Sequence, residues 1–294
     1  MRWNSISLMG LGLLGGSLAL AIKRRQLAGR VVARVRRAAA LAECRKLGIV
    51  DTVTQDIREA VEGSELVILC TPLSEMAGLA GGMGPFLKKG AIVTDVGSVK
   101  GTVVRELEPL ARQAGAEFVG SHPMAGSEKT GVGAARADLF ENAVCLVTPG
   151  RDSAPEAAAV VEAFWKAVGG CPLRMTPEAH DDLVSRSSHL PHVVAAGLAN
   201  YVLSPVHPKE QGAVCANGFR DTTRIAGGSP EMWRDIALAN RQNLGRVLGV
   251  FIEDLKEFQW ALERQDATAI EEFFAKARQR RNHWDAHAGA ASPE

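Results

Sequence analysis

The chain has 294 residues, enough for two domains with sizeable hydrophobic cores. Its 34 basic and 33 acidic residues leave a formal charge of +1, which gives no electrostatic argument for nucleic acid or a membrane surface as a partner. The five cysteines are scattered and lack the spacing of a metal site or a disulfide framework. We therefore expect reduced thiols, no metal and a cytoplasmic location.

A glycine-rich turn near the N-terminus joins the apolar run 6–9 to a segment of helical composition. Gly10 permits a tight turn, Gly12 lets the backbone approach a pyrophosphate, and Gly15 lets the helix pack closely on the strand. The glycines and the basic cluster 23–25 argue against a signal peptide or a membrane-spanning helix. The segment predicts a dinucleotide site whose contacts are Gly10, Gly12, Leu13, Leu14 and Gly15.

The end of the second predicted strand, residues 30–35, bears on which nicotinamide cofactor binds. An NAD enzyme carries Asp or Glu here for the ribose hydroxyls. In this chain Val35 takes that place, and Arg36 and Arg37 follow. Without a carboxylate to repel a phosphate, and with two guanidiniums to bind one, the sequence favours NADP. NAD stays possible, because the two arginines could instead form a solvated turn.

Apolar runs typical of buried strands alternate with helical segments through the first half of the chain. Further strands are predicted at 66–70, 91–96, 117–119, 143–148 and 173–175, and helices at 38–47, 101–114 and 155–168. Residues 1–176 are therefore predicted to form an α/β, Rossmann-like, doubly wound parallel sheet. Residues 177–294 have helical periodicity and are predicted to form an all-helical domain. Their apolar stretches 193–203 and 244–252 exceed what one small domain buries, which predicts a homodimer.

Ligands of open parallel sheets bind beyond the carboxyl ends of the strands, and three loops there carry candidate groups. Thr71 and Pro72 follow one strand and are predicted to contact the cofactor, Ser98 follows the next, and His122 lies in the loop 120–126. A histidine with an ordinary pKa near ~6.5 can accept a proton at neutral pH. We predict His122 as the catalytic base and Ser98 as the hydroxyl that orients it, although loop histidines are often plain surface residues.

The chain resembles the prephenate and arogenate dehydrogenases of tyrosine biosynthesis at the segments 10–17, 95–100, 120–129, 188–192, 217–226 and 230–234. The resemblance implies NAD(P)-dependent oxidative decarboxylation of a small cyclohexadiene substrate. It also implies that His122 takes the proton from the ring hydroxyl, and that Ser98 bonds to that hydroxyl or to the histidine. Arg224 is implied to bind the ring carboxylate, and His192 and Trp233 to lie near the substrate.

The residue types agree in part with these roles. Arg220 and Arg224 lie four apart, on one face of a helix, and arginine suits bidentate binding of carboxylates. Arg224 is the preferred substrate residue, because Arg220 could pair with an acid and be structural. His189 and His192 have a spacing that could chelate a metal, but no further ligands accompany them, so histidines in the core or lining the substrate are favoured. Residues 180–182 are typical of the beginning of a helix.

The sequence thus predicts a prephenate dehydrogenase that forms 4-hydroxyphenylpyruvate and reduces NADP or NAD. Arogenate dehydrogenase, or a dual-specificity cyclohexadienyl dehydrogenase, stays open because the keto and amino side chains of the substrates differ little. A hydroxyisobutyrate-type dehydrogenase is a more distant alternative, but no lysine lies between Met175 and His207 to serve such a reaction. A non-catalytic NADP-binding sensor would not need His122, Ser98 and Arg224 together.

Overall fold

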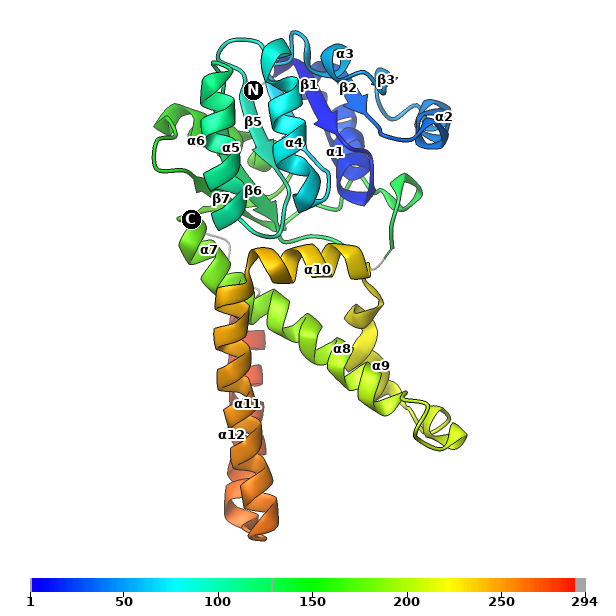
Figure 1. Ribbon diagram of the computed structural model, residues 1–294, viewed down its shortest axis with the longest axis vertical. Coiled ribbons are helices and arrows are strands. Elements are labelled where there is room, and N and C mark those ends of the chain that lie inside the picture. Colours follow the sequence, from blue (N-terminus) through cyan, green and yellow to red (C-terminus); the bar gives the residue numbers. More distant parts are fainter. Residues whose placement is uncertain (1, 128, 289–294) are drawn as a thin grey trace. The chain divides into compact units, whose positions relative to one another are not determined.

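The computed structural model describes residues 2–127 and 129–288. Two compact units are present, Met1–Asn240 and Arg241–Glu294 (Figure 1). The helices that follow residue 176 up to Asn240 belong to the first unit, and the predicted domain boundary after residue 176 stays a prediction. No helix among the described residues is long and apolar enough to cross a membrane.

The first unit is built on an eight-stranded sheet of order β3-β2-β1-β4-β5-β6-β7-β8. Neighbouring strands run parallel except β6 and β7, which are antiparallel. The strands are β1 (Trp3–Met9), β2 (Ala28–Arg34), β3 (Thr52–Thr54), β4 (Leu66–Leu69), β5 (Ile92–Asp95), β6 (Glu117–Pro123), β7 (Val144–Pro149) and β8 (Cys171–Arg174). The predicted doubly wound α/β fold is confirmed, and the short β3 is an addition to it.

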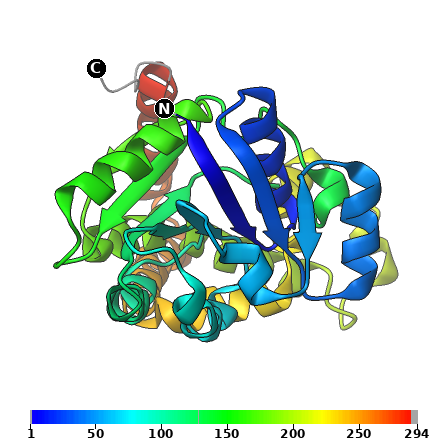
Figure 2. The ribbon, with the colours of Figure 1, turned by 90° about the horizontal axis from the view of Figure 1, so that it is seen from above.

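Helices cover both faces of this sheet (Figure 2). One face carries α1 (Leu13–Arg24), α2 (Ala38–Leu47) and α6 (Pro155–Ala167), and the other carries α3 (Ile57–Val61), α4 (Leu73–Met83) and α5 (Gly101–Gln113). Successive side chains of a strand point to opposite faces, so Ile68 enters the first core and the adjacent Leu69 the second. This double burial is why the strands are continuously apolar.

The remaining helices of the first unit follow β8. They are α7 (Pro177–Val184), α8 (Leu190–Val202), α9 (Asn217–Thr223) and α10 (Pro230–Ala239), with short 3-10 turns at Lys209–Gly212 and Arg224–Gly227. Two further 3-10 turns, Gly84–Phe86 and Val132–Ala134, lie earlier in the chain. A π-turn, Ser185–His189, joins α7 to α8 just before Pro191, which lacks an N–H and cannot continue a regular ladder. The side chain of Thr176 caps α7 by accepting from the N–H of Ala179 at 3.2 Å. The prediction that residues 180–182 begin this helix is therefore wrong.

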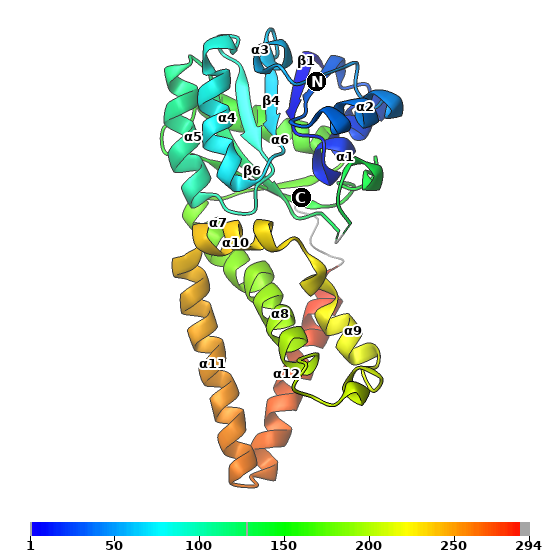
Figure 3. The same ribbon diagram turned by 45° about the vertical axis from the view of Figure 1, so that its right-hand side comes forward.

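The second unit is a pair of helices, α11 (Arg241–Glu263) and α12 (Ala267–Ala288), joined by a tight turn (Figure 3). Gln265 in this turn has a positive φ of 53°. Phe258 of α11 packs against Phe273 and Phe274 of α12, with ring centroids 4.7 and 5.7 Å apart. Other large apolar side chains of this unit, including Trp260, are exposed in the single chain.

The glycine turn between β1 and α1 depends on the absence of side chains. Gly10 has a φ of +115°, and its N–H donates to the carbonyl oxygen of Arg34 at 2.9 Å. A Cβ on Gly15 would lie 2.0 Å from the carbonyl oxygen of Gly10, whereas a Cβ on Gly12 would meet no atom within 4 Å. Gly15 is thus required by the fold, and Gly12 leaves open space at the helix N-terminus.

Replacing Gly15 with alanine should lower the free energy of unfolding by about 2–3 kcal/mol, because the new methyl group forces the strand and helix apart. The matched control is Gly12→Ala, which meets no neighbour and should leave the free energy of unfolding nearly unchanged. Chemical denaturation followed by circular dichroism measures both values. Equal stability of the two variants would contradict this account of the turn.

Candidate active site

His122 lies on strand β6, which continues through Pro123. Residues 119–123 pair with the antiparallel strand β7, so that His122 stands opposite Leu146. The expectation that residues 120–126 form a loop is therefore wrong for 120–123. Glycine and proline suggested a turn there, but the close approach of Lys100 and Thr148 to Gly120 requires a residue without a side chain. The strand holds His122 with only 7% of its surface exposed.

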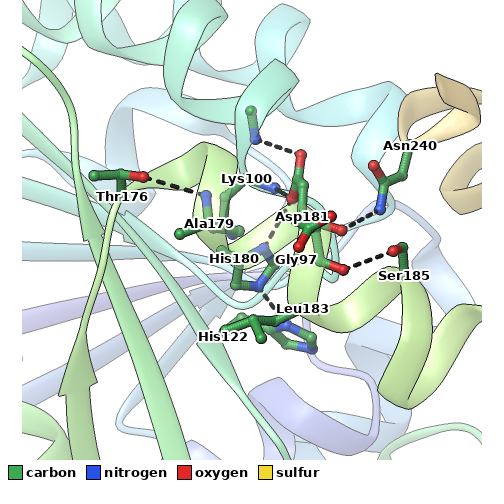
Figure 4. Close-up of polar contacts among 12 residues, drawn as sticks. Gly97, Lys100, His122, Thr176, Ala179, His180, Asp181, Leu183, Ser185 and Asn240 are labelled. Carbon is green, nitrogen blue, oxygen red and sulfur yellow. Dashed lines mark hydrogen bonds and ion pairs between the residues drawn. The ribbon is translucent and has the colours of Figure 1, made fainter. Parts of the chain in front are cut away.

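A chain of hydrogen bonds runs from His122 through His180 to Asp181 (Figure 4). The Nδ1 atom of His122 lies 2.9 Å from Nε2 of His180, and Nδ1 of His180 lies 2.8 Å from Oδ1 of Asp181. The carboxylate of Asp181 also accepts the backbone N–H groups of Lys100 and Gly101, at 2.7 and 2.9 Å. These are the first N–H groups of α5, so an acid from α7 caps a helix of the sheet layer.

This chain determines which ring nitrogens carry protons. A carboxylate only accepts hydrogen bonds, so Nδ1 of His180 must donate to Asp181. In a neutral imidazole the other nitrogen is then an acceptor, which makes His180 Nε2 accept from Nδ1–H of His122. His122 is left with a lone pair on Nε2. The arrangement therefore presents one basic nitrogen, fixed in direction by two groups behind it.

Burial lowers the pKa of both histidines, which favours their neutral forms. Burial, then the nearby His180 and the ammonium of Lys100, lower the pKa of His122 well below 6.5. Burial also lowers the pKa of His180, although its hydrogen bond to Asp181 acts in the opposite direction. Burial opposes the charge of Asp181, but the hydrogen bonds from His180 and from the N–H groups of α5 outweigh it and lower the pKa of this carboxyl.

Side chains replace the backbone ladder between the ends of β5 and β6. The two strands pair at residues 92–93, and beyond this the carboxylate of Asp95 accepts the N–H of Ser121 at 3.0 Å. The buried ammonium of Lys100 forms an ion pair with Asp95 and donates to the carbonyl oxygen of Ser121 at 2.8 Å. The hydroxyl of Ser121 donates to the carbonyl oxygen of Asp95 at 2.6 Å. A buried ion pair thus holds the strand end that carries His122.

A second group of side chains gathers on the helices that follow. The ring of His192 stacks on Trp233 with centroids 3.7 Å apart, and His189 meets the edge of the same indole at 6.1 Å. Burial lowers the pKa of His192, and the charge of Arg224 lowers it further. Burial lowers the pKa of His189 to about 4. Its Nδ1 lies 3.2 Å from the amide nitrogen of Asn240, which itself donates to the carbonyl oxygen of Asp181.

Ser98 and Arg220 are the predicted residues whose roles are least supported by contacts. Ser98 is partly buried in the loop between β5 and α5, while the hydrogen bond to Nδ1 of His122 is made by His180. Arg220 is exposed on α9, and Arg224 begins the 3-10 turn after it.

Sequence reasoning did not identify the groups behind His122, which are Asp95, Lys100, His180, Asp181 and Asn240. A buried acid or lysine in an apolar sequence context is the one signal that could have drawn attention to Asp95 and Lys100. Nothing in the sequence pairs His180 with a residue 58 positions earlier. Among the described residues, no group of three or more His, Cys, Asp or Glu side chains is arranged to hold a metal ion.

The residues at the glycine turn fit a dinucleotide. The open space at Gly12 lies at the N-terminus of α1, where no side chain caps the free N–H groups. Across the turn, the hydroxyl of Thr71 is buried without a hydrogen-bond partner among the described residues, and Pro72 is the N-cap residue that precedes α4. A cavity of about 950 Å³ is lined by Leu13, Glu43 and residues of the segments 126–127 and 129–139.

The end of β2 adds two cations to this region. Val35 is buried, and Arg36 and Arg37 are exposed. The guanidinium of Arg36 forms an ion pair with Glu75 in the first turn of α4.

Comparison with known proteins identifies the family. Residues 18–172 match the family described as "Prephenate dehydrogenase, nucleotide-binding domain", and residues 176–276 match "Prephenate dehydrogenase, dimerization domain". A cyclohexadienyl dehydrogenase of Zymomonas mobilis is 36% identical over 283 residues, which cover 95% of this chain and 95% of the relative.

Two solved structures extend the match to the fold. Prephenate dehydrogenase of Aquifex aeolicus, in complex with hydroxyphenyl propionate and NAD+, has a TM-score of 0.89 at 31% identity and covers 96% of this chain and 98% of its own. Arogenate dehydrogenase of Synechocystis has a TM-score of 0.80 at 28% identity, with coverage of 95% and 99%. With both halves of the chain matched, this protein belongs to the prephenate dehydrogenase family of NAD(P)-dependent oxidoreductases.

Proposed function

We propose that the protein converts prephenate to 4-hydroxyphenylpyruvate by oxidative decarboxylation, with NADP preferred over NAD. The observation that carries this proposal is the hydrogen-bonded chain Asp181–His180–His122, which leaves Nε2 of His122 as an oriented base. When bound, a nicotinamide cofactor would supply the acceptor for the hydride of the carbinol carbon. His122 removes the hydroxyl proton as hydride leaves, so that the carbinol becomes a carbonyl.

The second half of the reaction needs no further base. The carbonyl stands across the ring from the carbon that bears the carboxylate, so loss of carbon dioxide sends its electron pair through the ring and forms a phenolate. The proton held by His122 can return to that oxygen. Burial of His122 excludes water from this transfer, and the hydrogen bond from Nδ1 to His180 keeps the basic nitrogen directed at the substrate.

Arg224, His192 and Trp233 are proposed to bind the substrate. The stacked rings of His192 and Trp233 supply an aromatic wall, and the charge of Arg224 is felt at His192. A guanidinium binds a carboxylate through two hydrogen bonds. Ser98 is proposed to contact the ring hydroxyl, because it lies in the loop that follows the carboxyl end of β5, where ligands of open parallel sheets bind.

The NADP preference is supported by the end of β2. Val35 offers no carboxylate to the ribose, and the exposed Arg36 and Arg37 can approach a 2′-phosphate. Gly10, Gly12, Leu13, Leu14 and Gly15 are proposed to hold the pyrophosphate, with Thr71 and Pro72 beside the adjoining sugar or nicotinamide. NAD is expected to bind less tightly, since it lacks the phosphate.

The test is an assay of the purified protein with the four combinations of prephenate or arogenate and NADP or NAD, followed by the absorbance of the reduced nicotinamide. We expect the highest kcat/KM with prephenate and NADP. A higher value with arogenate would reassign the substrate, which the cyclohexadienyl and arogenate dehydrogenase relatives make the second candidate. An equal or higher value with NAD would contradict the role given to Arg36 and Arg37.

We propose that the protein is a homodimer formed through its helical half. The second family match is described as a dimerization domain, and Trp260, Phe274 and Trp284 are exposed on α11 and α12 of the single chain. Sedimentation velocity at micromolar concentration should give the mass of two chains, and a monomer would contradict the proposal.

Replacing His122 with asparagine should lower kcat by ~100-fold or more, the usual worth of a positioned base. Cofactor affinity, measured by fluorescence titration, should not change. Because the pKa of His122 lies below 6.5, wild-type kcat/KM should fall only as the pH drops below that value, and this fall should vanish in the variant. Near-normal turnover would remove His122 from the mechanism.

Two substitutions at His180 separate its hydrogen bond from its bulk. Glutamine offers a carbonyl oxygen to Nδ1–H of His122, whereas leucine offers none and leaves that donor buried and unpaired. We expect His180→Gln to retain a kcat at least ~10-fold above that of His180→Leu. Circular dichroism would confirm that both variants fold. Equal kcat values would mean that the chain behind His122 does not orient it.

Replacing Arg224 with alanine should raise KM for prephenate by roughly 10- to 100-fold, because the substrate carboxylate loses a bidentate partner. The matched control is Arg220→Ala on the preceding helix, where we expect a change of less than about threefold. Initial-rate kinetics at saturating cofactor measure both. A larger rise in KM for Arg220→Ala than for Arg224→Ala would assign the binding of the substrate carboxylate to Arg220.

A further inference from the structure

The end of β2 lacks a carboxylate of its own, but one reaches it from a neighbouring helix. Glu75, in the first turn of α4, forms an ion pair with the guanidinium of Arg36. The two residues are 39 positions apart, and their side chains are 37% and 72% exposed. The N-terminal end of a helix favours a negative charge, so the carboxylate of Glu75 is stabilised where it stands.

Arg36 is held beside the glycine turn by its backbone. The N–H of Gly10 donates to the carbonyl oxygen of Arg34 at 2.9 Å, and the side-chain amide of Gln55 donates to the carbonyl oxygen of Arg36 at 2.8 Å. These bonds fix the main chain on either side of Val35. The side chain of Arg36 is largely exposed, so its contact with Glu75 can be exchanged for one with another anion.

We propose that Glu75 is a cofactor-specificity residue that competes with the 2′-phosphate of NADP for Arg36. The proposal rests on the proposed binding of that phosphate by Arg36. A 2′-phosphate must displace the carboxylate of Glu75 and then stand close to it, which weakens NADP binding relative to NAD. Glu75 thus supplies from α4 part of the negative charge that Val35 lacks. It keeps the preference for NADP modest and leaves NAD as a usable cofactor.

The test compares two fragments of the cofactor that differ only in the 2′-phosphate. Isothermal titration of the full-length protein, without cofactor, with 2′,5′-ADP and with 5′-AMP gives a ratio of dissociation constants that reports the 2′-phosphate alone. In Glu75→Gln we expect the preference for 2′,5′-ADP to rise by about fivefold, the scale of one exposed ion pair. The control is Glu62→Gln, which breaks the exposed pair of Glu62 with Arg58 on α3 and should leave the ratio unchanged.

A double-mutant cycle with Arg36→Ala shows whether Glu75 acts through the arginine. In the Arg36→Ala background, Glu75→Gln should change the ratio by less than about twofold. An unchanged ratio in the single variant, or an equal rise in both backgrounds, would overturn the proposal. Wild-type protein that does not distinguish the two fragments would instead contradict the NADP preference, and a rise in Glu75→Gln would still support the role of Glu75.

Discussion

The buried carboxylate of Asp181 is the group on which the rest of the site depends. It accepts hydrogen bonds from His180 and from the N–H groups of Lys100 and Gly101, so every one of its partners is a donor. A buried carboxylate is tolerable only when such donors replace the lost water. Because two of the donors begin α5 and the third is an imidazole, the same ion joins α7 to the sheet layer and sets the tautomers of two histidines. The hydrogen bonds of this one carboxylate therefore fix both the packing of α7 and the positions of the protons on the two imidazoles.

The charges around His122 favour a base that is neutral before substrate arrives. Burial, then His180, Lys100 and His189, lower the pKa of His122, and Asp95 offsets the charge of Lys100 within the protein. The proposed substrate is a dicarboxylate, so its binding would bring negative charge to the open side of the imidazole. Negative charge stabilises an imidazolium and would raise the basicity of His122 in the proposed reaction.

The sequence predicted the alternation of strands and helices in the sheet and the glycine turn, because these follow from local patterns. Residues 38–47 form a helix as expected, and the glycine turn has the predicted position. The chain behind His122 was not predicted, because His180 meets it through the packing of α7 against the sheet and not through any spacing. The same is true of Glu75 and Arg36. The strand position of His122 was missed since Gly120 and Pro123 suggest a turn, while an antiparallel partner overrides that local preference.

Between the ends of β5 and β6, side-chain hydrogen bonds take the place of main-chain pairing. This break in the ladder divides the sheet into two halves. The glycine turn belongs to the half that ends at β5, and the strand end with His122 is hydrogen-bonded along β7 in the other half. In the proposed reaction the hydride leaves the carbinol carbon and the proton leaves its hydroxyl oxygen toward His122, so the two transfers would use groups from both halves of the sheet. Thr94, Asp95, Lys100 and Ser121 bridge the break in place of a regular ladder. The proposed alignment of base and cofactor would thus depend on a few polar atoms, and a change in the length of any one of these side chains would shift one half of the proposed site against the other.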